Sequence, residues 1–280
     1  MLKNAVRWAF ILLALLLIGP IMGRLIGSLH ALDGSHHATP LASSTPLKGL
    51  GLLLLVSGVA TGFGVFMSRI YGLANGMNVA GLIFAWCAWN TGTIDALARS
   101  AGHKSPLASM AVEGLIVAVV ACVGALLLQR ESLQARQDRT LRISVKDMLG
   151  RTALVSIVAA IVAGAALGWF VANDTLKGQA VFAAIAAGIA AGAAAQLSSA
   201  QNTAAVVPAA MLGVGVLAAL GPICGMILHG SRFVAAASSG SVFSLAVPVP
   251  LDWIAGAYLG VPIGIQWAGS MIEKRLSQPA

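Results

Sequence analysis

Residues 106–128 read PLASMAVEGLIVAVVACVGALLL, an apolar run in which Glu113 is the only charged side chain. An α-helix rises ~1.5 Å per residue, so ~20 apolar residues cross the ~30 Å hydrocarbon core of a bilayer. Seven further apolar runs lie near residues 5–27, 49–68, 77–97, 152–172, 179–199, 205–228 and 251–271. The sequence therefore predicts an all-α, polytopic transmembrane helix bundle of about eight spans.

The composition excludes a water-soluble domain. Of the 280 residues, 58% are hydrophobic and 9% are charged, whereas a soluble domain carries about 25% charged residues. The first run, 5–27, resembles a signal peptide. However, it continues past Pro20 without a small-x-small cleavage site, so we expect a retained span.

The net charge of +8 fits orientation in a membrane better than nucleic-acid binding, because cytoplasmic loops of membrane proteins collect Lys and Arg. With the N-terminus inside, eleven of the 17 Lys and Arg residues fall on the inner side. We therefore expect both termini in the cytoplasm and a multi-pass location, such as a bacterial inner membrane. The expected partner is the lipid bilayer, and neither a nucleic acid nor a cofactor is expected.

A basic stretch divides the chain into two membrane halves of four spans each. We expect a first half at 1–129, a cytoplasmic connector at 130–151 and a second half at 152–280. The first residues of some spans are similar, such as Arg7-x-Ala-Phe-Ile and Arg151-x-Ala-Leu-Val, and suggest a parallel four-plus-four repeat. Chance matching of short apolar motifs stays the stronger alternative.

Glycines four residues apart recur within the spans. They are found at Gly58/Gly62, Gly164/Gly168, Gly188/Gly192, Gly221/Gly225 and Gly256/Gly260/Gly264. Lipid offers no hydrophobic drive between helices, so such faces associate through close backbone approach. We expect them to pack spans together, and they could also contact other membrane subunits or a second copy.

The segment 231–250 is apolar enough to cross the bilayer but contains Ser238-Ser-Gly-Ser241 and ends in Pro-Val-Pro. A crossing would move the basic C-terminal end outside. We therefore expect a re-entrant or interfacial segment on the outer side, either a pore loop or lid or a plain surface hairpin.

Glu113 is the only acid well inside a span. A carboxylate at that depth must be neutral, paired or hydrated, so it either binds a proton or cation or bonds quietly to a neighbouring helix. Asn90, Thr93 and Asp95 follow at the outer end of the adjacent span. Together with Glu113 they are the candidate substrate- or ion-binding residues, lining an outward-facing vestibule. Trp86 and Trp89 are explained by an interfacial aromatic belt.

Metal binding and catalysis have little support. His30, His36 and His37 share an outer loop, but their spacing matches no zinc signature, so a flexible polar loop is the simpler interpretation. The phosphate-binding, zinc-protease and serine-hydrolase motifs are absent. No catalytic residue is assigned, and an intramembrane enzyme is the least favoured class. A transporter or permease and a non-catalytic subunit or scaffold of a larger membrane complex remain, equally weighted.

The charge distribution makes a topological prediction. Reporter tags fused to Met1 and to Ala280 should both be protected from protease in sealed, right-side-out cells. Both should become accessible when the membrane is permeabilised. Protection of one tag and exposure of the other would contradict an even number of crossings.

Overall fold

The computed structural model describes residues 2–36, 38–100, 106–135, 150–199 and 203–276, and its regular elements within these ranges are helical. In chain order they are α1 (Leu2–Leu13), the π-helical turn η1 (Ala14–Ile18), α2 (Gly19–Gly27), α3 (Pro46–Tyr71), α4 (Leu73–Trp89), α5 (Ile94–Ser100), α6 (Leu107–Ala135), α8 (Arg151–Val171), α9 (Lys177–Ser198), α10 (Thr203–His229), the 3-10 turn η2 (Gly230–Arg232), α11 (Phe233–Ser238), the 3-10 turn η3 (Ser244–Ala246) and α12 (Pro250–Leu276).

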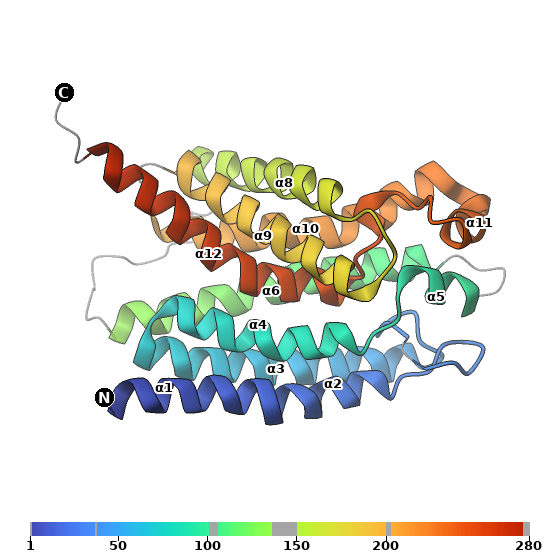
Figure 1. The fold of residues 1–280 in the computed structure, drawn as a ribbon, viewed down its shortest axis with the longest axis horizontal. Coiled ribbons are helices and arrows are strands. Elements are labelled where there is room, and N and C mark those ends of the chain that lie inside the picture. Colours follow the sequence, from blue (N-terminus) through green and yellow to red (C-terminus); the bar gives the residue numbers. More distant parts are fainter. Residues whose placement is uncertain (1, 37, 101–105, 136–149, 200–202, 277–280) are drawn as a thin grey trace.

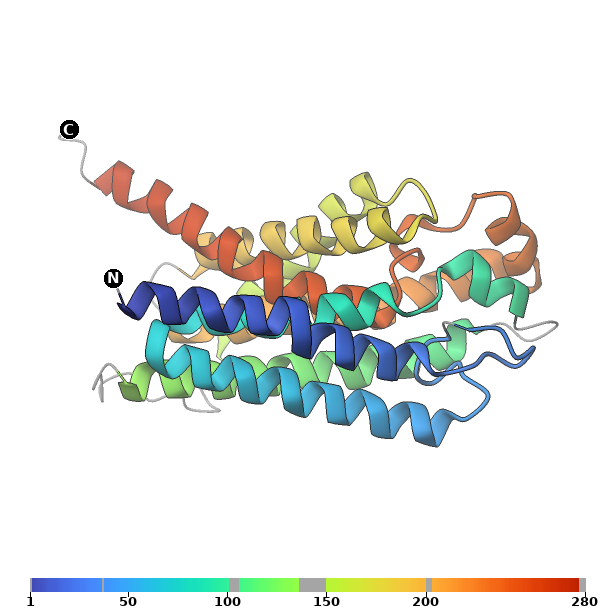
Figure 2. The ribbon, with the colours of Figure 1, turned by 60° about the horizontal axis from the view of Figure 1, so that its bottom comes forward.

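The long helices lie side by side along one axis and alternate in direction (Figure 1). The first half of the chain, through α6, forms one side of the bundle, and α8 to α12 form the other. The start of α1 and the end of α12 lie at the same end of the bundle in both ribbon views (Figure 2). The short helices α5 and α11 pack against each other at the opposite end.

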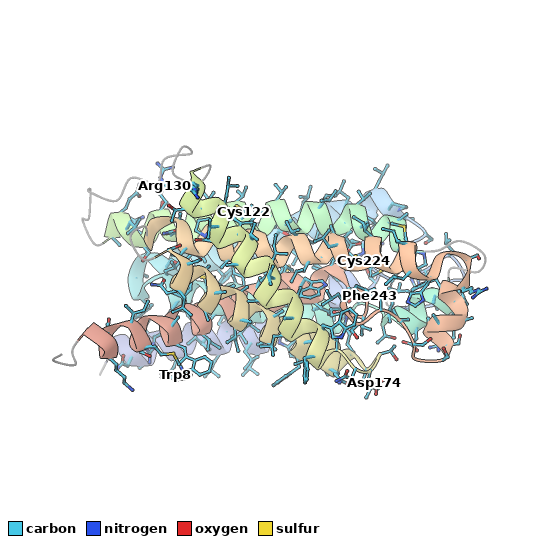
Figure 3. All side chains as sticks on the ribbon, turned by 90° about the horizontal axis from the view of Figure 1, so that it is seen from above. Trp8, Cys122, Arg130, Asp174, Cys224 and Phe243 are labelled. Carbon is cyan, nitrogen blue, oxygen red and sulfur yellow. The ribbon has the colours of Figure 1, made fainter. Side chains whose placement is uncertain are left out.

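Six described helical segments are long and apolar enough to cross a membrane. They are Asn4–Gly27, Pro46–Tyr71, Leu107–Ala135, Arg151–Val171, Lys177–Ser198 and Ala205–Ser238. Large apolar side chains point outward along these helices, with Phe170 78% and Ile227 77% exposed, while Arg130 and Asp174 lie toward opposite ends (Figure 3). The chain is therefore a multi-pass membrane protein. Eight crossings and cytoplasmic termini stay predictions, because α4 is shorter than these six and α12 is not among them.

The first span is one rod interrupted by a π-helical turn. Pro20 has no N–H and its ring crowds the carbonyl four residues earlier, which loosens the preceding turn. The widened turn leaves the Leu15 carbonyl available, and the indole Nε1–H of Trp86 on α4 donates to it at 2.7 Å. The π turn therefore gives α4 a hydrogen bond to the first span, and Phe10 packs on Phe66 with ring centroids 5.0 Å apart.

Glycine faces make the closest helix contacts, as the sequence predicts for most of its glycine pairs. Helices α9 and α12 form the most extensive pair in the bundle. A Cβ at Gly188 would meet the Gly256 carbonyl, and one at Gly264 would meet the Ile189 carbonyl. Gly58 and Gly62 differ, because a Cβ at either position meets nothing within 4 Å. This pair lies in a shallow apolar groove of about 440 Å³ between the first span and α3.

The segment 231–250 turns back on itself at the end of α10. It forms η2, α11 and η3, and residues 245–250 are buried. The Leu245 carbonyl lies against Gly221, eight residues before the end of α10, which is about 12 Å along that helix. Phe243 N–H donates to His229 Nε2 at 3.0 Å and ties the segment to α10. Most of the connector, 136–149, lies outside the described residues.

The glycine contacts predict two opposite outcomes. Gly260→Ala should lower the stability of the detergent-solubilised protein by about 1–3 kcal/mol, the usual cost of overpacking a tight contact. Gly58→Ala, on the open groove, should leave stability unchanged or raise it slightly, since alanine favours a helix over glycine. Thermal or SDS unfolding of both variants measures the difference. Equal effects would contradict the close packing of α9 on α12.

Candidate functional site

A buried carboxylate on α6 is covered by the segment that joins α2 to α3. Glu113 is fully buried, and its Oε2 accepts a hydrogen bond from the Leu41 backbone N–H at 2.8 Å. Around Leu41, residues Ala38, Thr39, Pro40 and Ser43 are buried too. The Pro40 carbonyl packs against Gly49 at the start of α3, where any larger side chain would displace it. Residues 38–43 therefore form a plug over Glu113 at one end of the bundle.

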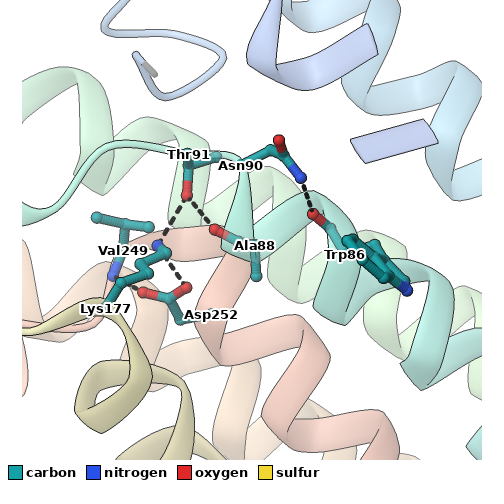
Figure 4. Close-up of polar contacts among 7 residues, drawn as sticks. All are labelled: Trp86, Ala88, Asn90, Thr91, Lys177, Val249 and Asp252. Atoms are coloured by element: carbon teal, nitrogen blue, oxygen red, sulfur yellow. Dashed lines mark hydrogen bonds and ion pairs between the residues drawn. The ribbon is translucent and has the colours of Figure 1, made fainter. Parts of the chain in front are cut away.

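A buried ion pair lies close to this carboxylate. Lys177, the first residue of α9, places its Nζ 2.7 Å from Asp252 Oδ1 near the start of α12. The lysine side chain is 12% exposed and the aspartate is fully buried. Lys177 Nζ also donates to Thr91 Oγ1 at 2.8 Å, and the Val249 N–H donates to Asp252 Oδ2 at 2.9 Å (Figure 4). Thr91 in turn donates to the Ala88 carbonyl at 2.7 Å.

Glu113, Lys177 and Asp252 form one electrostatic unit, which we call the charged cluster. Both Lys177 and Asp252 act on the charge of Glu113, although the three residues come from three different helices. Two acids and one base carry a net charge of −1 when all three are ionised. Because water is excluded from the site, that imbalance is costly. The cluster is therefore suited to take up one cation.

The other candidate residues from the sequence have partners outside this cluster. Asn90 Nδ2 donates to the Trp86 carbonyl at 2.8 Å, and its side chain contacts Gly23 and Gly27 of α2. Figure 4 shows Asn90 turned away from Lys177, while its neighbour Thr91 points toward it. The structure thus brings Thr91 to Lys177 of the charged cluster, whereas the Asn90 side chain faces α2.

Thr93 and Asp95 belong to the short helix α5. Asp95 forms an ion pair with Arg99 one turn later, at 2.9 Å, and Arg99 is largely exposed. Partial burial opposes ionisation of Asp95, but the Thr93 hydroxyl and the Arg99 guanidinium outweigh it and hold the pKa of this carboxyl below its usual value. Asp95 therefore stays ionised near neutral pH, and an exposed pair of this kind contributes little stability.

Two of the three candidate histidines of this loop lie next to each other. His30 and His36 form an isolated bridge, and their ring centroids lie 4.6 Å apart. Both residues are exposed, whereas His37 and His103 lie outside the described residues. Within the described ranges, no three His, Cys, Asp or Glu side chains are grouped as a metal site requires.

Sequence reasoning did not find Lys177 or Asp252 as part of the site. One signal was present. Lys177 and Asp252 each begin a span that carries a long glycine face, and both lie on the same predicted side of the membrane. If these two spans are packed together through their glycine faces, Lys177 and Asp252 are expected side by side at the same end of the helix pair.

The fold and the cluster together define the class of protein: a multi-pass α-helical membrane protein with ionisable groups buried inside its bundle. Comparison of the chain with protein-family models, with curated proteins and with solved structures gave no significant match.

The ion pair makes a stability prediction. Lys177→Met should destabilise the protein by about 3–5 kcal/mol, because it leaves buried acids without their base. Adding Asp252→Asn to it should recover most of that loss, since it removes the aspartate charge that Lys177 balances. Unfolding of both variants in detergent measures the effect, with Lys48→Met, at an exposed position of α3, as the control. A double variant no more stable than Lys177→Met would contradict the pairing.

Proposed function

We propose that the protein is a transporter or permease for a small solute or ion, and that the charged cluster is its central ionisable site. The observation that carries the proposal is the burial of Glu113, Lys177 and Asp252 in one cluster supplied by three helices. Charged groups inside a membrane protein are expensive and commonly mark a solute or proton pathway. This cluster replaces the wider vestibule expected from Asn90, Thr93 and Asp95.

The cluster draws its residues from both halves of the chain. Glu113 belongs to the first half of the chain, whereas Lys177 and Asp252 belong to the second. If the first four spans correspond in order to the last four, the same pairs make contact in both halves. The contact of α2 with α4 corresponds to that of α8 with α10, and the contact of α3 with α6 corresponds to that of α9 with α12. Two contacts between the halves, α6 with α10 and α4 with α12, also correspond to each other under the same numbering. This pattern supports the proposed parallel repeat, and transporters commonly bind solutes between such repeats.

The same proposal gives the cluster a gate at one end of the bundle. The plug 38–43 closes the bundle at the end of the charged cluster, and residues 245–250 fill the neighbouring space beside α10. The plug is irregular backbone, and residues 245–250 run from the 3-10 turn η3 into the start of α12. Both are largely enclosed by protein, as a gate at membrane depth must be. We place this end on the outer side, with eight crossings and both termini in the cytoplasm, as the distribution of Lys and Arg favours.

Alternating access can be tested before the solute is known. In a background with Cys87, Cys122 and Cys224 replaced by Ala, Thr39→Cys should react with a membrane-impermeant maleimide added outside intact cells. The reaction should be faster than that of Ala121→Cys, which is fully buried in the middle of α6. Equal protection of both cysteines, without change on adding any solute from a panel, would contradict transport through the cluster.

The solute itself can then be sought by stabilisation. A solute that raises the unfolding temperature of the wild type should lose this effect in Glu113→Gln and keep it in Glu131→Gln, on the same helix. Uptake of that solute into proteoliposomes should be lost in Glu113→Gln and retained in the wild type and in Glu131→Gln.

A scaffold within a larger complex is the second candidate. In its favour, the apolar groove of about 440 Å³ between the first span and α3 is open at the surface of the bundle, where a partner helix could pack. A scaffold predicts that Glu113→Gln leaves activity of the complex intact, and that the same partner proteins co-purify in mild detergent with each variant.

A further inference from the structure

The two carboxylate oxygens of Glu113 have different surroundings. Oε2 accepts the Leu41 N–H at 2.8 Å. Oε1 is buried and has no hydrogen-bond partner among the described residues, and the same holds for the buried hydroxyl of Thr39. Thr39 lies beside this carboxylate and interacts with it. Two unsatisfied polar atoms therefore belong to neighbouring side chains, whereas buried polar groups are normally paired.

The charges around Glu113 decide whether its carboxyl group is ionised or protonated. Lys177 from α9 already lies 2.7 Å from Asp252 of α12, so its charge is largely balanced. Other helices packed against α6 add little: α4 has no charged residue, α3 carries Lys48 and Arg69 near its ends, and α10 carries only His229, at its end. The segment over Glu113 carries His30, Asp33 and His36 at its exposed tip. An ionised Glu113 would therefore be a buried anion without a full counter-charge.

The ligand set argues for a proton over a metal cation. Hard cations such as Ca²⁺ and Mg²⁺ take six or more oxygen ligands. The neighbouring side-chain oxygen that acts on Glu113 is the Thr39 hydroxyl, and the described residues contain no group of three or more His, Cys, Asp or Glu side chains that could hold a metal ion. A proton needs only the carboxylate oxygen that holds it and one acceptor.

We infer that Glu113 is a proton-binding site: in this conformation it holds a proton on Oε1, hydrogen-bonded to the Thr39 hydroxyl, beneath the plug 38–43. The inference rests on the proposed function, for which it names the coupling ion. Leu41 and Thr39 both belong to the plug, so the two hydrogen bonds to Glu113 close the site from one end. When the plug withdraws, water reaches Oε1.

Release then needs no other reactant. The O–H bond of Glu113 breaks, the carboxylate keeps the electron pair, and a water molecule accepts the proton as hydronium. Lys177 interacts electrostatically with both acids, so it can balance the new charge of Glu113 while Asp252 keeps its hydrogen bond from Val249. The proton is exchanged with the side on which the plug opens.

Infrared spectroscopy of the full chain in lipid nanodiscs tests the inference directly. Titration over about pH 4–10, which brackets the reference values of carboxylates, should remove a protonated-carboxyl band from the wild-type spectrum. The band should be absent in Glu113→Gln and present in Glu131→Gln. Thr39→Val should shift the band, because its hydrogen bond is lost, and Thr39→Ser should restore the position. The Thr39 variants keep the assignment testable if Glu113→Gln does not fold.

The outcomes separate the proton site from the transport role. A band that persists at every pH would indicate a fixed structural proton and overturn the inference. A carboxylate signal that responds to Na⁺ or K⁺ at constant pH, but not to pH, would overturn it as well. Solute flux that requires Na⁺ instead of a pH gradient would contradict the proton and leave the transporter standing. Titration of Glu113 without any solute flux would support the proton site and contradict transport.

Discussion

The close approach of α9 and α12 is the constraint on which the site depends. Their glycines remove the side chains that would otherwise hold the two helices apart, so backbone lies against backbone along the shared face. The two helices begin at the same end of the bundle, which brings Lys177 and Asp252 to 2.7 Å. A wider spacing would leave the lysine and the aspartate as two separate buried charges, each too expensive to keep in a dry interior.

The remaining polar contacts follow from the need to satisfy this pair. Thr91 reaches Lys177 from the end of α4, and the backbone before α12 supplies an N–H to Asp252. Glu113 joins from α6, and the backbone N–H of Leu41 in the plug 38–43 donates a hydrogen bond to it. The interior of the bundle is therefore well satisfied around the ion pair and incomplete around Glu113. That difference is the reason why the proposed proton site is placed at Glu113.

The helical membrane class could be predicted from the sequence, because apolar runs of this length have few other solutions. Glu113 could also be found, since a single acid in an apolar run is conspicuous. The partners of Glu113 could not be found in the same way. Lys177 resembles an ordinary loop lysine until α9 is placed against α12, and Leu41 acts through its backbone, which carries no signature in sequence. Asn90, Thr93 and Asp95 are close to the site along the chain, but helix rotation and local ion pairing direct them elsewhere.

The π-helical turn in the first span also sets the rotational phase of the residues before it. An extra residue in one turn rotates the preceding segment by about 100° relative to an uninterrupted α-helix. This offset lets Phe10 lie against Phe66 while the Leu15 carbonyl faces Trp86. Loss of a single residue between Ala14 and Ile18 would therefore turn the aromatic side of this helix toward lipid, although every apolar residue of the span would still be present.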